Sequence, residues 1–515
     1  MGFNNASIAK NVLKASIVSV IANLFTIVVG FTYRMFFLKY LSVNYLGING
    51  LFSSILMVLS LAELGFSSAI SYRLYKPISE NDTYNVGRLM NFYKKVFRYV
   101  AISILFAGLL LMPFIKYFIK TTSEIPADIN LYFIYFLNII QTVSSYLYAY
   151  KQALYAADQK QYKLYIFSAL ENFVINIVQL LILFLWKNYT LTLVASIIIY
   201  LVANYIFGLI ISSQYKEVFF VKDELSMEER KQIIDDTKAS MSHKIGNVVL
   251  TSTDSIVITK FIGLSATGLM NNYQIIFNYT LKIASQIFSS FTASIGKIHF
   301  VMNTFDKKQI YNLLNLINYW FAGFVTVCLF ILSNSFIEIW IGKEMLLSST
   351  IVGLYSIQIF LELSKVVTNS YIMASGLFVK DRIRPIIEAS INIVISVYLS
   401  IRIGIAGVII GTIVSHLLTS TWREPYILYK YEFKDSLNDY WFLFVKIICI
   451  VTLSSIIIFF MSNIVSSTNH ILNLFLLLML SIFVYNILFI IVFRNNDSYI
   501  YLKKNLFRII KEVIH

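Results

Sequence analysis

The sequence has few charged residues, few prolines and few cysteines for its length. Asp, Glu, Lys and Arg make up 13% of its 515 residues, whereas a soluble domain usually carries about 25%. Because a water-soluble protein covers its surface with polar groups, this deficit excludes a soluble enzyme and a disordered chain. The two cysteines, Cys328 and Cys449, lie inside apolar runs, which excludes a disulfide scaffold.

The apolar residues, which make up 58% of the chain, recur in runs long enough to cross a bilayer. We therefore predict an all-α integral membrane protein with about fourteen transmembrane helices and only short connections. Four of the five prolines fall at expected helix edges, where a missing N–H does little harm. The expected spans are 13–33, 45–69, 97–119, 129–150, 164–186, 190–213, 245–263, 268–295, 311–333, 347–375, 384–403, 404–422, 441–463 and 471–493.

The net charge of +15 reflects where the cations lie along the chain. Of the 42 Lys and Arg, 31 fall in the N-terminal segment, in the alternate loops that follow even-numbered helices, and in the C-terminal tail. The other set of loops and helix ends holds only 8. Such a bias predicts that both termini are cytoplasmic. The positive charge then faces anionic membrane lipids, and no nucleic-acid partner is needed to explain it.

An internal repeat predicts two duplicated lobes. Residues 39–48 can be laid on 260–269 at an offset of 221, and residues 82–97 on 306–321 at an offset of 224. Each lobe would hold six helices, with a pseudo-twofold axis along the membrane normal and a central cleft between the lobes. The expected divisions are 1–213 for the N-lobe, 214–244 for a cytoplasmic inter-lobe linker, 245–440 for the C-lobe, and 441–515 for two appended helices and a tail.

The linker is the longest connection and carries both acidic and basic residues. Within it, the segment from Leu225 to Glu229 places a serine three residues before a glutamate. This spacing is typical of a capping box, so a surface helix is expected to begin there.

Polar side chains recur at helical spacing along several of the expected membrane helices. They are either contacts between helices or the lining of a wet cavity, and the unbroken stripe of the eighth helix favours the cavity. Lys282 near the middle of that helix either contacts an anion or pairs with Glu63 or Asp254. The candidate substrate-binding residues are Asn23, Arg34, Asn271, Gln274, Asn278, Lys282 and Gln286.

Four other ionisable residues in the expected spans are interpreted as structural. Glu362 and Lys365 stand three residues apart and are expected to pair, while Glu388 is expected to make buried contacts between helices. A single histidine, His416, is expected to be a packing residue. The sequence contains no phosphate-binding loop, no H-E-x-x-H motif, no paired cysteine spacing and no nucleophile elbow, so neither an enzyme, nor a metal site, nor a cofactor is predicted.

The N-terminal quarter of the chain resembles the polysaccharide-transporter branch of the multidrug/oligosaccharidyl-lipid/polysaccharide superfamily, the Wzx-type flippases. Ser42 departs from the pattern, which usually has glycine there. The segments that carry the resemblance are Arg34–Ser42, Tyr45–Phe52, Leu61–Gly65 and Tyr72–Pro77, with Ala374–Gly376 and Gly404–Thr412 farther along.

This resemblance implies twelve core helices in two bundles forming a V, plus two extra helices. It implies that the protein moves an undecaprenyl-diphosphate-linked oligosaccharide from the cytoplasmic to the outer leaflet of a bacterial cell membrane. Arg34 is carried over as a cavity cation. The resemblance also implies a polysaccharide polymerase and glycosyltransferases as partners. An ion-coupled multidrug exporter of the same fold is the main alternative, although the first helix has no acidic residue; a membrane polymerase or glycosyltransferase is the lesser one.

Overall fold

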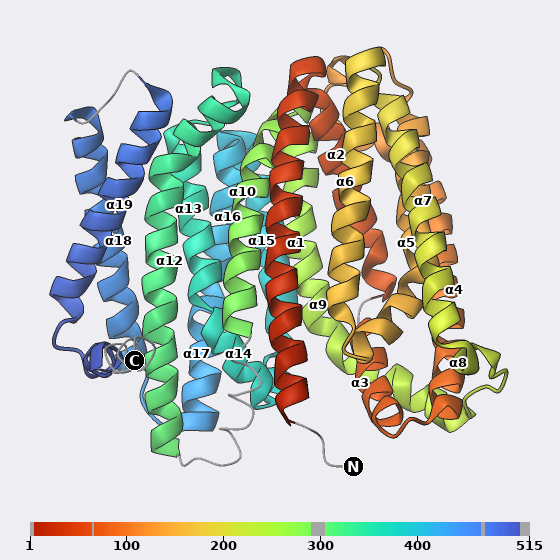
Figure 1. Cartoon of the computed structure of the whole chain (residues 1–515). Coiled ribbons are helices and arrows are strands. Elements are labelled where there is room, and N and C mark those ends of the chain that lie inside the picture. Colours follow the sequence, from red (N-terminus) through yellow and green to blue (C-terminus); the bar gives the residue numbers. More distant parts are fainter. Residues whose placement is uncertain (1–4, 64–65, 290–303, 465–468, 505–515) are drawn as a thin grey trace. The chain divides into compact units, whose positions relative to one another are not determined.

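The computed structural model describes all of the chain except residues 1–4, 64–65, 290–303, 465–468 and 505–515 (Figure 1). The described part is helical, and ten of its helices are long and apolar enough to cross a membrane. The prediction of an all-α membrane protein is confirmed, whereas the number fourteen stays a prediction. The expected end of the eighth span, at residue 295, lies outside the described residues.

The chain forms two compact units, Met1–Gly268 and Leu269–His515. The boundary between them falls inside a helix, later in the chain than the expected linker 214–244. The prediction that the chain consists of two duplicated lobes depends on the sequence repeat and stays a prediction.

The first unit contains most of the elements up to residue 268. Helix α1 packs along α6, α4 along α5, α7 along both α5 and α6, and α2 along α9. The elements are α1 (Asn5–Tyr40), α2 (Val43–Leu59), the 3-10 turn η1 (Ser60–Glu63), α3 (Phe66–Ser79), α4 (Thr83–Leu111), η2 (Met112–Phe118), η3 (Thr122–Glu124), α5 (Leu131–Ala157), α6 (Gln161–Trp186), α7 (Tyr189–Gln214), α8 (Lys216–Phe220) and α9 (Met227–Phe261).

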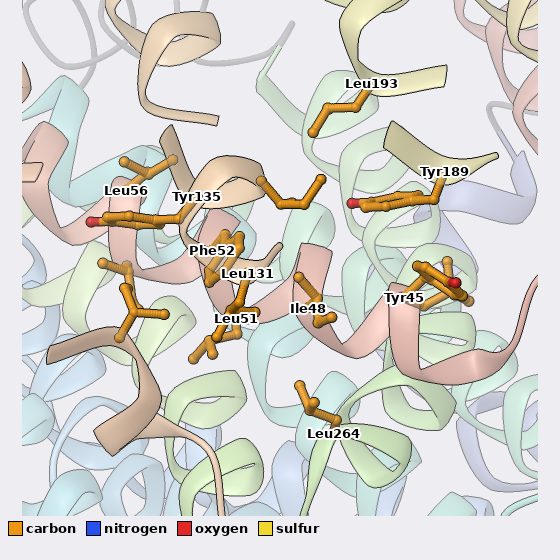
Figure 2. Packing of buried hydrophobic residues seen from close by; sticks show 14 of the residues in the cluster. Tyr45, Ile48, Leu51, Phe52, Leu56, Leu131, Tyr135, Tyr189, Leu193 and Leu264 are labelled. Carbon is orange, nitrogen blue, oxygen red and sulfur yellow. The ribbon is translucent and has the colours of Figure 1, made fainter. Parts of the chain in front are cut away.

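Helix α2 provides the centre of the apolar core of the first unit. Ile48, Leu51 and Phe52 are fully buried there. Figure 2 shows these side chains among residues of α5 and α7, including Tyr135 and Tyr189. This face of α2 is apolar, and other helices must cover it for the helix to be stable.

The capped helix expected in the linker is confirmed, and it is longer than predicted. The Ser226 side chain accepts from the Glu229 backbone N–H, and the Glu229 carboxylate accepts from the Ser226 N–H at 2.6 Å. From this cap α9 continues without a break to Phe261. The expected membrane span 245–263 therefore forms the later part of a longer helix, because nothing between the cap and the apolar run ends the helix.

The long span expected at 45–69 is divided in the structure. Helix α2 ends at Leu59, and the 3-10 turn η1 follows before α3 begins at Phe66. At this point the Ser60 hydroxyl donates to the Leu56 carbonyl at 2.8 Å. A serine that bonds back to its own helix competes with the regular helical pattern and favours a bend.

The second unit begins within α10 and ends in the C-terminal hairpin of α18 and α19, both of which pack against α12. Its elements are α10 (Leu264–Ser289), α12 (Thr304–Ile341), η4 (Lys343–Met345), α13 (Ser349–Ser364), α14 (Val366–Ala374), η5 (Leu377–Asp381), α15 (Arg384–Ile403), α16 (Ile405–Leu418), α17 (Ser420–Leu428), the π-helical turn η6 (Tyr429–Phe433), α18 (Asn438–Ile464) and α19 (His470–Phe493).

Glycines bring α15 and α16 into close contact, as the junction expected at residues 403 and 404 suggests. Gly404 turns the chain with φ +65° and ψ −140°. A Cβ on Gly411 would lie 2.2 Å from the Ser396 hydroxyl oxygen, so only glycine fits there. Pro385 stands in the first turn of α15, as predicted, whereas Pro77 and Pro425 lie inside helices and not at their edges.

Candidate functional site

The polar stripe of α1 and its exposed apolar residues lie on different faces. Asn23 and Arg34 are partly buried. Ile21, Leu24 and Val28 are each more than half exposed. At 3.6 residues per turn, the two sets lie about 120° apart around the helix. The apolar face is suited to lipid, and the polar stripe that was predicted from the sequence turns toward the protein.

The two acidic candidates of the first unit are both partly buried. Glu63 lies in η1, where Tyr146 of α5 is within hydrogen-bonding reach of its carboxylate and of Ser60. Asp254 lies on α9, the helix that packs along α2. The expected pairing of either residue with Lys282 stays a prediction.

Helix α10 presents the longest polar stripe among the candidates. Its packed face consists of apolar and aromatic side chains, of which Tyr273, Phe277 and Ala284 are fully buried. The polar stripe lies about 140° around the helix from this face. Within the stripe Asn278 and Lys282 are exposed, while Asn271, Gln274 and Gln286 are partly buried. The five polar residues therefore share one face of α10, as predicted.

The structure also contains a buried group of charged residues in the second unit, which the sequence interpretation missed as a group. Arg384 at the start of α15 lies at its centre. Its Nε is 2.7 Å from Asp381 Oδ2, and its Nη2 is 2.9 Å from Glu424 Oε1. Its Nη1 donates to Glu388 Oε2. One guanidinium thus joins three carboxylates from η5, α15 and α17, all of them almost fully buried.

The ion network extends from Glu388 to α13 and α16. His416 Nδ1 contacts Glu388 Oε1, and His416 Nε2 is 3.8 Å from Glu362 Oε1. Lys365 Nζ donates to the Ser420 hydroxyl at 2.8 Å and lies 3.3 Å from His416 Nδ1. We call the eight side chains that form this network the buried charge cluster; they are Glu362, Lys365, Asp381, Arg384, Glu388, His416, Arg423 and Glu424.

Several predictions about these residues are resolved. Glu388 makes buried contacts between helices, as expected. The Lys365 ammonium lies against Ser420 and His416 and not against the Glu362 carboxylate. The expected direct pair of Glu362 and Lys365 is therefore wrong. His416 bridges two carboxylates and is more than a packing residue. The sequence signal that could have revealed the cluster is the spacing of Asp381, Arg384 and Glu388, which puts three charges on one side of a helix start.

Two cavities, of about 530 and 540 Å³, lie elsewhere in the described residues. Tyr40, Asn44 and Glu124 are among the residues that line the first, and Lys430 and Lys434 among those that line the second. None of the predicted site residues lines either cavity. The polar helix faces, and not these two cavities, carry the predicted site residues.

Comparison with known proteins identifies the fold. No protein family matches the sequence, and no curated protein matches it either. Among solved structures, the chain is similar to the lipid II flippase MurJ in an inward closed conformation, with a TM-score of 0.70 at 14% identity over 93% of this chain and 99% of that one.

Similarity extends to multidrug transporters. An inward-facing MATE family transporter of the MOP superfamily matches with a TM-score of 0.59 at 13% identity, over 80% of this chain and 98% of that one. A MATE transporter from Vibrio cholerae matches with a TM-score of 0.58 at 13% identity, over 84% and 98%. The chain therefore has the multi-pass helical membrane fold that the MurJ flippase and the MATE transporters share.

Proposed function

We propose that the protein is a flippase that moves an undecaprenyl-diphosphate-linked oligosaccharide from the cytoplasmic to the outer leaflet of a bacterial cell membrane. The observation that carries the proposal is the polar stripe of α10 with the exposed Lys282, in a chain whose fold is similar to that of a lipid II flippase. The proposed orientation has both termini in the cytoplasm, in accord with the bias of Lys and Arg.

The chemistry of such a substrate fits the composition of the stripes. A diphosphate-sugar head cannot cross hydrocarbon without shielding, whereas a polyprenyl tail can remain in lipid. Amide side chains such as Asn271 and Asn278 can exchange hydrogen bonds with sugar hydroxyls. Lys282 and Arg34 supply the fixed positive charge that a diphosphate needs once water is removed. The protein need only cover the head and alternate its access between the two sides.

An ion-coupled multidrug exporter is the second candidate, because MATE transporters share the fold. The sequence of α1 argues against it. This helix carries Asn23 and Arg34 but no Asp or Glu between Asn5 and Tyr40, so it offers no acidic residue for a cationic drug or a coupling ion. A membrane polymerase or glycosyltransferase is disfavoured by the short loops of the described chain.

Lys282 provides the direct test. The protein is placed in proteoliposomes with an undecaprenyl-diphosphate oligosaccharide that carries a fluorophore on its sugar, and arrival in the opposite leaflet is followed by chemical quenching. A hydrogen bond to a charged group contributes about 1.5–3 kcal/mol, so Lys282→Ala should slow flipping roughly 10- to 100-fold. Lys282→Arg should retain part of the rate.

A matched control is Lys446→Ala, since the Lys446 ammonium lies 4.0 Å from the centroid of the Phe442 ring and is outside the stripe. It should flip at the wild-type rate. Recovery of flipping in Lys282→Ala upon adding Glu63→Gln or Asp254→Asn would instead identify Lys282 as a structural partner and overturn its substrate role. Drug export by the wild type without any flipping would overturn the proposed function itself.

A further inference from the structure

We infer that Glu362, His416 and Glu388 form a proton-binding relay inside the second unit, with His416 as the site that holds the proton. The binding of the proton stands on the geometry of the buried charge cluster alone. Only its use, to drive or gate the movement of substrate, rests on the proposed function.

The three groups follow one another from a partly exposed carboxylate to the interior. His416 and Glu388 are hydrogen-bonded, whereas the distance between His416 and Glu362 must shorten before a proton can cross it. The Glu362 side chain is 30% exposed, while those of His416 and Glu388 are 7% and 1% exposed. Glu362 Oε1 is 3.8 Å from His416 Nε2, and Nδ1 on the other side of the ring contacts Glu388 Oε1. An imidazole can accept a proton at one nitrogen and release one from the other, so a proton can pass from Glu362 to Glu388 through the ring. Inside membrane helices, chains of carboxylates and histidine are typical of proton pathways.

Charge balance within the cluster favours the binding of one proton. Four carboxylates face three cations, so the cluster carries one excess negative charge when His416 is neutral and all four carboxylates are ionised, and uncompensated charge in the interior is costly. A proton on His416 makes the charges equal. The facing groups are Glu362 on α13, Lys365 between α13 and α14, Asp381 on η5, Arg384 and Glu388 on α15, Arg423 and Glu424 on α17, and Tyr440 of α18, whose phenol lies close to Glu424.

Arg384 is the cation that contacts the three most buried carboxylates of the cluster. Its three N–H groups already bind Asp381, Glu388 and Glu424, so the guanidinium offsets part of their negative charge. No group of three or more His, Cys, Asp and Glu in the described chain has the arrangement of a metal site. Of the cluster side chains, imidazole is the one that ordinarily changes its charge near neutral pH.

The relay lies at two helix breaks, where a change in charge can change structure. Lys365 stands at the junction of α13 and α14, and Ser420 begins α17 directly after Thr419, whose φ of −127° and ψ of −88° interrupt the helix. The Ser420 hydroxyl binds both Lys365, at 2.8 Å, and Glu388, at 2.9 Å. A proton on His416 repels the neighbouring Lys365 ammonium and strengthens the bond to Glu388. It therefore alters the contacts that join the two breaks.

The test measures the protonation state of His416 directly. Protein with 15N-labelled histidine is studied in lipid bilayers by solid-state NMR between pH 5 and pH 9. The chain has five histidines, and His416→Gln identifies the signal of residue 416. This signal should change from protonated to neutral within the range. In Glu388→Gln the midpoint should fall by about 1–3 pH units, because the carboxylate that favours the charged ring is lost.

Glu338→Gln is the matched control. Glu338 Oε1 lies 3.7 Å from the ring of His470, so this change should move the midpoint of His470 and leave that of His416 in place. Should Glu388→Gln not fold, Glu362→Gln at the partly exposed end gives the same readout. A His416 signal that keeps one protonation state throughout, or a midpoint that neither carboxylate variant moves, would overturn the relay.

The role in transport is measured separately, with a pH-sensitive dye inside the proteoliposomes. Substrate-dependent proton movement that disappears in His416→Gln supports coupling. Flipping without any proton movement overturns coupling but not the proton site. Absence of flipping in the wild type contradicts the proposed function, while the NMR result for His416 still stands.

Discussion

Replacing Gly47 with alanine would place a methyl group against backbone that cannot move aside. A Cβ on Gly47 would lie 2.1 Å from the Leu264 carbonyl oxygen, and a Cβ on Gly268 would lie 2.2 Å from the Val43 carbonyl oxygen. All four residues belong to the first unit. The two contacts are reciprocal and obey the offset of 221 residues found in the sequence repeat. The start of α2 and the start of α10 thus cross through a matched pair of glycines.

The size of the effect follows from these distances. Ordinary contact with a Cβ begins at 3.4 Å, so the helices must separate by about 1.3 Å at Gly47. Overpacking of this kind costs about 1–3 kcal/mol. For a domain of this size the melting temperature should fall by roughly 2–12 °C. The measurement is thermal unfolding of the purified protein in detergent, followed by the fluorescence of a thiol-reactive dye or of tryptophan.

The control is Gly353→Ala, because a Cβ there would meet only the ring of Phe330, at 3.1 Å, and a side chain can rotate away. It should lower the melting temperature less. The double variant of Gly47 and Gly268 should cost less than the two single changes added together, since one separation of the helices relieves both contacts. Wild-type stability in Gly47→Ala, or full additivity in the double variant, would refute the close crossing.

Three other predictions follow from separate parts of the molecule. Arg384→Gln should destabilise the protein by about 3–5 kcal/mol, because it leaves three buried carboxylates without their cation; Arg402→Gln, at the exposed end of the same helix, should have little effect in the same unfolding assay. A cysteine at Asp235 should resist an impermeant thiol reagent added to intact cells, and strong labelling would contradict the predicted topology. The pKa of Glu229 is lowered chiefly by the hydrogen bond from the Ser226 backbone N–H. The stabilisation that Glu229 gives to the start of α9 should therefore be complete at neutral pH and be lost as the pH falls through the lowered pKa. Hydrogen exchange of that first turn, corrected for intrinsic rates, should differ between wild type and Glu229→Gln at pH 7 and become equal in acid.

The local features of the sequence predicted the corresponding local features of the fold. The capping box at Ser226, the turn at Gly404 and the proline in the first turn of α15 all occur as expected, because each depends on residues within one helical turn. The same holds for the polar stripe of α10, since helical spacing alone puts its residues on one face. Whether Arg34 and Lys282 act on one substrate stays a prediction, because that depends on more than the periodicity of a helix.

Other features could be decided only by contacts between helices. The break after Leu59 is marked by a local bond from Ser60, but the apolar run through this region gave no sign of where it would bend. The buried charge cluster is the clearest case. It joins residues between Glu362 and Glu424 that are contributed by η5 and several helices. Three of its carboxylates contact the single guanidinium of Arg384. The sequence by itself determined that the chain enters a membrane as helices, because composition sets how much surface lipid can cover. Only the tertiary structure decided which buried charges meet, because the energy of a buried charge depends on its nearest partners, and helix packing alone selects them.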